Sequence, residues 1–135
     1  MNEQSGIEPS IHRSVLHKEV LKALDLKEGA RVLDGTVNGG GNEQLFGEKI
    51  GMRGILIGVD LDGGGLERDK ERLKESPAKV MLVEESFRNM DKAAKLHKVA
   101  AFDAILLDLG FSSDQLEQSG RGFSFKKDEP LLLTF

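Results

Sequence analysis

Short apolar runs alternate with amphipathic stretches along most of the chain, and this alternation constrains the fold more than any other feature. Four runs have the length and composition of buried strands: Arg31–Asp34, Ile55–Asp60, Val80–Val83 and Ala104–Asp108. The stretches that follow the first three have helical spacing, near Glu43–Ile50, Leu66–Glu75 and Asn89–Val99. A further helix is predicted over residues 14–24, with Ser14 as its N-cap. Strands that alternate with helices indicate βαβ units, so we predict an α/β fold with a parallel sheet and helices on both faces.

The alternation stops after Asp108, where a loop is predicted over Gly110–Gly122 and a short apolar run ends the chain. A doubly wound sheet normally continues past its switch point. We therefore expect a sheet truncated after the fourth strand, which would leave that strand as an exposed edge. A homodimer through this edge or through the apolar C-terminus would cover it. Residues 1–11 are expected to form a disordered tail, and residues 12–135 one incomplete Rossmann-like domain.

The composition is that of a soluble globular protein, with 39% hydrophobic and 31% charged residues in 135. No apolar run approaches the roughly 20 residues that span a bilayer, so no membrane partner is expected. The chain has no cysteine and only three histidines, which excludes disulfides and thiolate metal sites and predicts no metal cluster. Cytoplasm is the expected location. The net charge of −4, with basic and acidic residues interleaved, argues that this part of a nucleic-acid enzyme is not its main docking surface.

Three of the four predicted strands end in an aspartate: Asp34, Asp60 and Asp108. In open parallel sheets, ligands bind at the carboxyl ends of the strands near the switch point. A single aspartate at such a place is more often a helix cap or a loop residue than a ligand contact. Three at corresponding positions favour a binding site.

A glycine-rich loop over residues 34–42 joins the first strand to the next helix. Consecutive glycines allow positive φ and close approach of a ligand to the main chain. The dinucleotide pattern G-x-G-x-x-G is absent, because Gln44 stands where its last glycine belongs. Asp60 lies roughly 20 residues beyond the loop, where an acidic residue binds ribose hydroxyls in Rossmann proteins. A ribose contact without a phosphate-binding signature favours S-adenosylmethionine over NAD.

Four sequence blocks carry a family resemblance: His12–Leu16, the Asp34-Gly35-Thr36 turn with Gly39–Gly41, Leu106–Leu116 and Arg121–Asp128. Together they resemble the MraW-type ribosomal RNA cytosine-N4 methyltransferases, from His12 to about Leu131. The resemblance implies a Rossmann-like, S-adenosylmethionine-dependent class I methyltransferase. Its implied substrate is the N4 amine of a cytosine in 16S ribosomal RNA, so its implied partner is that RNA or the small ribosomal subunit.

The resemblance also implies a set of cofactor-binding positions, namely Gly40, Gly41, Asn42, Asp60, Phe87, Asp108 and Gln115. In this set Asp60 contacts the ribose and Phe87 the adenine side. Asp108 is in addition the candidate catalytic residue, which would orient the cofactor or the target amine. Taken without the resemblance, Phe87 is expected in the core and Gln115 in a solvated loop.

The chain departs from the family pattern at several positions. Asn42 stands where the glycine loop usually ends in histidine, and Asp114 where a proline usually precedes the matching glutamine. The segment after Asp128 loses an aspartate and an arginine of the family pattern. These departures leave open an alternative, a truncated or degenerate homologue that binds cofactor or a partner without catalysis. An NAD(P)-dependent oxidoreductase is a weaker alternative. His17 and His97 are expected at exposed helix positions.

Overall fold

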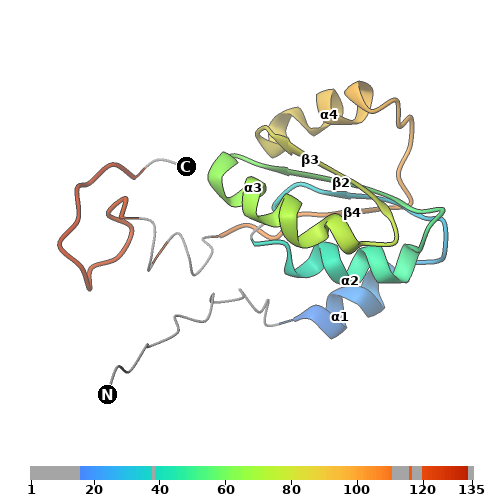
Figure 1. The fold of residues 1–135 in the computed structure, drawn as a ribbon, viewed down its shortest axis with the longest axis horizontal. Coiled ribbons are helices and arrows are strands. Elements are labelled where there is room, and N and C mark those ends of the chain that lie inside the picture. Colours follow the sequence, from blue (N-terminus) through green and yellow to red (C-terminus); the bar gives the residue numbers. More distant parts are fainter. Residues whose placement is uncertain (1–15, 38, 111–115, 117–119, 134–135) are drawn as a thin grey trace, which may run out of the picture.

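The computed structural model describes residues 16–37, 39–110, 116 and 120–133. The predicted tail, the Ser14 cap and Gln115 lie outside these residues. The elements in chain order are α1 (His17–Leu24), β1 (Arg31–Asp34), α2 (Gly41–Ile50), β2 (Ile55–Asp60), α3 (Gly63–Arg72), η1 (Leu73–Glu75), β3 (Lys79–Glu84), η2 (Phe87–Asn89), α4 (Met90–Leu96) and β4 (Ala104–Leu106). The four strands form one parallel sheet in the order β3-β2-β1-β4 (Figure 1), which confirms the predicted α/β fold.

Helices cover the sheet on both faces, as predicted. On one face Phe46 and Ile50 of α2 pack with Val32 and Leu56 of the central strands, and residues of α1 close this cluster. On the other face Ala93 of α4 packs in the cluster formed by Leu33, Ile57 and Val59. Neighbouring residues of β1 and β2 alternate between the two clusters, because successive side chains of a strand point to opposite faces. Figure 1 shows α4 on one side of the sheet and α1, α2 and α3 on the other.

The central strands β1 and β2 have the bounds that the apolar runs predict. The helix that follows β2 begins earlier than predicted, because three glycines, Gly63–Gly65, form its first turn. Glycine weakens a helix by about 1 kcal/mol per residue relative to alanine. The N-cap Asp62 offsets part of this cost, since its side chain accepts a hydrogen bond from the N–H of Gly65 at 3.1 Å.

The fourth strand is shorter than predicted. β4 ends at Leu106, two residues before Asp108, because its partner β1 ends at Asp34 and the register pairs Asp34 with Leu106. The expectation that this strand is covered on both faces is wrong, since Ile105 is 50% exposed. The predicted exposed edge is confirmed: β4 pairs only with β1 within the described part of the chain.

The strand order places the switch point of the sheet between β1 and β4. From β1 the chain moves through β2 to β3 on one side, and then returns to add β4 on the other side of β1. The loops that leave β1 and β4 therefore diverge at their carboxyl ends, which is where open α/β sheets bind ligands. Among the described residues, no helix combines the length and the apolar character that crossing a membrane requires.

Candidate functional site

The loop after β1 and the segment after β4 are joined by hydrogen bonds at the switch point. The N–H of Gly35 donates to the carbonyl oxygen of Leu106 at 2.9 Å. The N–H of Asp108 donates to the Oγ1 of Thr36 at 2.7 Å. Asp108 is thus brought to the glycine loop by its main chain, and the residue lies exposed at the edge of the sheet. This supports the prediction that the loop and Asp108 share one site.

The glycine loop requires glycine at Gly40 for two reasons. Its φ is +69°, in the left-handed region that residues with a Cβ seldom adopt. A Cβ there would also lie 3.0 Å from the Oδ1 of Asp69, a buried residue of α3. Gly40 is the N-cap of α2 and Gly41 its first residue, so both predicted cofactor contacts lie at the start of this helix. Arg72 of α3 donates to the carbonyl oxygen of Gly39 and so ties the loop to α3.

Asp34 does not face solvent, although the strand-end pattern marked it as a ligand candidate. Its side chain is fully buried at the end of β1. One oxygen, Oδ1, accepts hydrogen bonds from the N–H and the hydroxyl of Thr36, at 2.8 and 3.2 Å. Burial raises the pKa of Asp34 from 3.8 to about 6, and the bonds from Thr36 only partly oppose the rise. Asp34 therefore stabilises the glycine loop through its hydrogen bonds to Thr36.

Glu43 is an acidic residue of this region that the sequence analysis missed. It lies in the first turn of α2, is 1% exposed and contacts the Asp34 side chain. Burial, and next the negative charge of Asp34, raise the pKa of Glu43 well above its usual value. A signal was present in the sequence, because Glu43, Phe46, Gly47 and Ile50 have the spacing of one helix face. That face is the buried one.

Asp60 ends β2 as predicted and is partly exposed beside the site. Its Oδ1 accepts a hydrogen bond from the N–H of Asp62 at 2.9 Å, and burial raises its pKa above 3.8. The side chain of Asp62 forms an ion pair with Arg121 at 3.1 Å. The Arg121–Phe125 block is therefore held at the same edge as the predicted ribose contact.

Phe87 lies next to the beginning of the glycine loop. Its Cβ is 3.2 Å from the position that a Cβ on Gly35 would occupy, and its ring packs on the cluster around Leu33 and Ile57. Phe87 thus packs partly in the core, as the sequence pattern predicts, and also lies beside the glycine loop, as the family resemblance implies. A side chain at Gly35 would also displace Leu107, so this position of the loop has no free space.

Asn42 is buried in α2 and hydrogen-bonds through its Oδ1 to the Nδ1 of His17 at 2.8 Å. The expectation that His17 is exposed is therefore wrong, because α1 packs over this part of α2 and half-buries the ring. Gly40, Gly41 and Asn42 lie at the start of α2, whereas Asp108 lies next to Thr36 and Phe87 next to Gly35; the side chain of Asn42 is bonded to His17 of α1. Gln115, the remaining predicted contact, lies outside the described residues.

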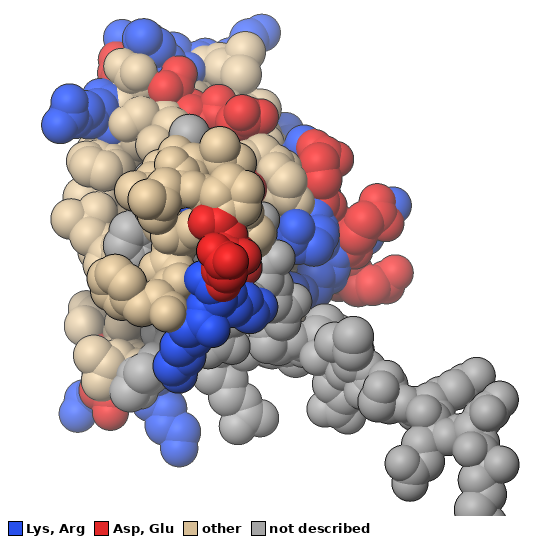
Figure 2. All heavy atoms as spheres, turned by 90° about the vertical axis from the view of Figure 1, so that its left-hand side faces the viewer, with Lys and Arg blue, Asp and Glu red and all other residues tan. Residues whose placement is uncertain are grey.

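Figure 2 shows the face of the molecule on which α3 begins, which is the carboxyl edge of the sheet. Acidic and basic side chains of the described residues are interspersed there, as the ion pair between Asp62 and Arg121 illustrates. In the part of the chain that the structure describes, no three His, Asp or Glu side chains are placed to hold a metal ion.

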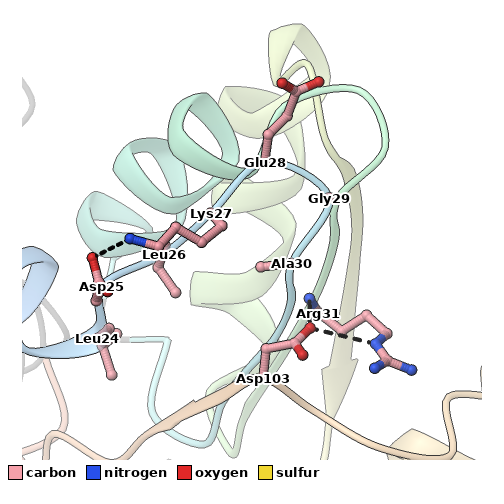
Figure 3. Close-up of a pocket in the computed structure, with 9 residues that line it drawn as sticks. All are labelled: Leu24, Asp25, Leu26, Lys27, Glu28, Gly29, Ala30, Arg31 and Asp103. Atoms are coloured by element: carbon pink, nitrogen blue, oxygen red, sulfur yellow. Dashed lines mark hydrogen bonds and ion pairs between the residues drawn. The ribbon is translucent and has the colours of Figure 1, made fainter.

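A hollow of about 480 Å³ lies at the opposite end of the sheet, where β1 begins (Figure 3). It is lined by Leu24–Arg31 and Asp103. Its charged groups are paired locally: Asp103 accepts from the main-chain N–H of Arg31 at 2.7 Å, and Lys27 contacts Asp25 at 2.6 Å. The hydrogen bonds from Arg31 lower the pKa of Asp103. This hollow lies far from the strand ends at which the glycine loop and Asp108 meet.

The sheet is parallel, has the strand order β3-β2-β1-β4 and carries a glycine loop at its switch point, which together define a Rossmann-like α/β protein. Comparison with known families makes the assignment specific. The model of the MraW methylase family matches residues 9–133, and the chain belongs to that family.

Curated relatives agree with the family assignment. Three of them, from Trichlorobacter lovleyi, Syntrophus aciditrophicus and Clostridium botulinum, are each named ribosomal RNA small subunit methyltransferase H. They are 42%, 40% and 39% identical to this chain over 89%, 90% and 89% of its length. The aligned part is 38%, 39% and 38% of the relatives' own lengths, so the chain spans less than two fifths of each.

Proposed function

We propose that this chain is the S-adenosylmethionine-binding part of a class I methyltransferase that modifies the N4 amine of a cytosine in 16S ribosomal RNA. The observation that carries the proposal is the glycine loop held at the switch point of a chain whose residues 9–133 match the MraW methylase family. The relatives' names support a small-subunit ribosomal RNA as the substrate. Such a substrate is consistent with a cytoplasmic enzyme.

The chemistry of the site suits an S-adenosyl cofactor. Gly40 and Gly41 carry no side chain at the start of α2, so a ligand can approach the main chain closely there. Asp60 offers a carboxylate that can accept hydrogen bonds from ribose hydroxyls. Phe87, which is only partly buried, offers an apolar surface that an adenine ring could contact. Asn42, Asp108 and Gln115 complete the proposed set of contacts.

When bound, the cofactor supplies a methyl group on a positively charged sulfur. The N4 amine of the cytosine would accept this methyl group and would lose a proton to water. This chain's contribution is to hold the two reactants at near-attack distance. In the proposal, Asp108 orients the amine or the cofactor through its carboxylate. It need not be a strong base, since the proton leaves after the transfer.

Calorimetry with S-adenosylmethionine, S-adenosylhomocysteine and NAD tests the cofactor assignment. We expect the two S-adenosyl ligands to bind and NAD not to bind. Asp108→Ala is expected to abolish binding, and Asp60→Ala to weaken it. The control is Glu48→Ala, which removes an exposed carboxylate from the second half of α2, the half that does not follow the glycine loop. Binding of NAD alone, or unchanged affinity in Asp108→Ala, would contradict the assignment.

A transfer assay tests the activity itself. Purified small ribosomal subunits and labelled S-adenosylmethionine are incubated with the chain, and the modified nucleoside is identified by mass spectrometry. The proposal expects N4-methylcytidine. Cofactor binding without any transfer would instead favour the alternative in which this chain binds cofactor or a partner but does not catalyse.

A further inference from the structure

Two buried carboxyl oxygens at the base of the glycine loop receive no N–H or hydroxyl hydrogen bond from the described residues. They are the Oδ2 of Asp34 and the Oε1 of Glu43, and both side chains are almost completely enclosed. An unpaired buried polar atom costs about 1–3 kcal/mol, so two such atoms in neighbouring side chains call for a common explanation.

The two carboxyl groups interact at short range, since the negative charge of Asp34 raises the pKa of Glu43 further, after the larger effect of burial. Two ionised carboxylates could not hydrogen-bond to each other, because neither has a proton to donate, and their charges would repel in a buried site. One shared proton satisfies both groups. The proton belongs on Glu43, because the N–H and the hydroxyl of Thr36 already donate to Asp34 and so favour a negative charge there.

We propose that Glu43 is a positioning residue of the candidate site, which stays protonated at neutral pH and donates a hydrogen bond to Asp34. Through its other oxygen Asp34 holds Thr36, with the Thr36 N–H at 2.8 Å. The Oγ1 of Thr36 in turn accepts from the N–H of Asp108 at 2.7 Å. A single chain of hydrogen bonds thus runs from the buried face of α2 to the candidate catalytic residue.

The charged groups around the pair disfavour a second negative charge. Asp108 faces Asp34 from the segment after β4, and Asp69 faces Glu43 from α3. The nearby cation Arg72 of α3 already contacts Asp69 at 3.6 Å and donates to the loop at Gly39. On the side of α1, His17 bonds to the amide of Asn42. Loss of the proton from Glu43 would therefore push the two carboxylates apart and loosen Thr36 and Asp108.

Infrared spectroscopy tests the protonation state without any ligand. At pH 7 the wild type is expected to show the carbonyl band of a buried neutral carboxylic acid, and Glu43→Gln to lose it. The matched control is Glu48→Gln, which changes an exposed glutamate of the same helix and should leave the band intact. Absence of the band in the wild type, or its persistence in Glu43→Gln, would overturn the proposal.

Amide hydrogen exchange tests the positioning role, also without ligand. Glu43→Leu removes the hydrogen-bond donor to Asp34, so the N–H groups of Thr36 and Asp108 should exchange about tenfold faster. Glu43→Gln still donates to Asp34 and should keep both N–H groups protected. Glu48→Leu is the control for α2. In the wild type, exchange corrected for its intrinsic pH dependence should accelerate at alkaline pH, and in Glu43→Gln it should not. Equal exchange in Glu43→Leu and the wild type would refute the role. If Glu43→Leu does not fold, the comparison of the wild type with Glu43→Gln across pH decides.

The last step rests on the proposed function, because it concerns cofactor affinity. The affinity for S-adenosylhomocysteine should fall at least about tenfold from pH 7 to pH 9 in the wild type, a loss of about 1.4 kcal/mol, and stay level in Glu43→Gln. Binding that is equally strong at both pH values in the wild type contradicts the link to the site. No binding at any pH contradicts the proposed function, and the infrared and exchange results then still decide the role of Glu43.

Discussion

Replacing Asp34 by asparagine should change how the stability of the protein depends on pH. Asp34 is fully buried, and its pKa is about 6 in the folded state against 3.8 for an exposed aspartate. Below pH 3.8 the group is protonated in both states, so its contribution to stability is fully present. As the pH rises to about 6, the unfolded state releases the proton first. The free energy of unfolding therefore falls over this range and levels off above it.

The magnitude follows from the two pKa values. The difference between 3.8 and about 6, at about 1.4 kcal/mol for each pH unit, corresponds to roughly 3 kcal/mol. Asp34→Asn removes this titration. Its amide keeps an oxygen that can accept from Thr36, and its NH₂ group can donate to Glu43. The stability of the variant relative to the wild type should therefore rise by roughly 2 kcal/mol between pH 4 and pH 7, because a smaller part of the difference is already present at pH 4.

Urea denaturation at pH 4, 5, 6 and 7, followed by circular dichroism, measures this difference. Only the difference between variant and wild type is interpreted, because other carboxylates, such as Asp103 with its lowered pKa, act in the opposite direction. Asp128→Asn, which changes an exposed aspartate, is the matched control. A difference between Asp34→Asn and the wild type that stays constant from pH 4 to pH 7 would refute the reasoning.

The glycine loop, the core and the C-terminal segment give three further predictions. In thermal unfolding, Gly40→Ala should destabilise the fold by at least about 1–2 kcal/mol, because Gly40 has a positive φ. Gly64→Ala, in the first turn of α3, should instead stabilise the fold by about 0.5–1 kcal/mol. Equal effects at the two glycines would contradict this assignment of the loop. Phe46→Ala should lower the free energy of unfolding in urea by about 3–5 kcal/mol, because the ring is fully buried between α2 and the sheet. A loss below about 1 kcal/mol would show that this cluster is not the core. Leu131–Leu133 are exposed, so we expect a homodimer in light scattering that Leu132→Lys weakens, and a monomeric wild type would exclude it.

Much of the fold could be predicted from the sequence because it depends on local patterns. The runs Arg31–Asp34 and Ile55–Asp60 became β1 and β2 with the predicted bounds, since strands buried on both faces are apolar along their whole length. The glycines of the loop indicated a backbone that a side chain would obstruct, and Gly40 has that geometry. The position of Asp60 at a strand end also followed from the pattern alone.

Other features depend on which elements meet in space, and only the tertiary structure decided them. β4 ends at Leu106 because its partner β1 ends, and a residue's own neighbours in sequence do not contain that information. Asn42 meets His17, 25 residues away, only because α1 packs on α2. In the sequence, Asp34 is a candidate ligand contact at a strand end, and nothing links it to Glu43. Their shared proton arises from burial and contact, because the cost of a charge depends on the water and the dipoles that remain around it after folding.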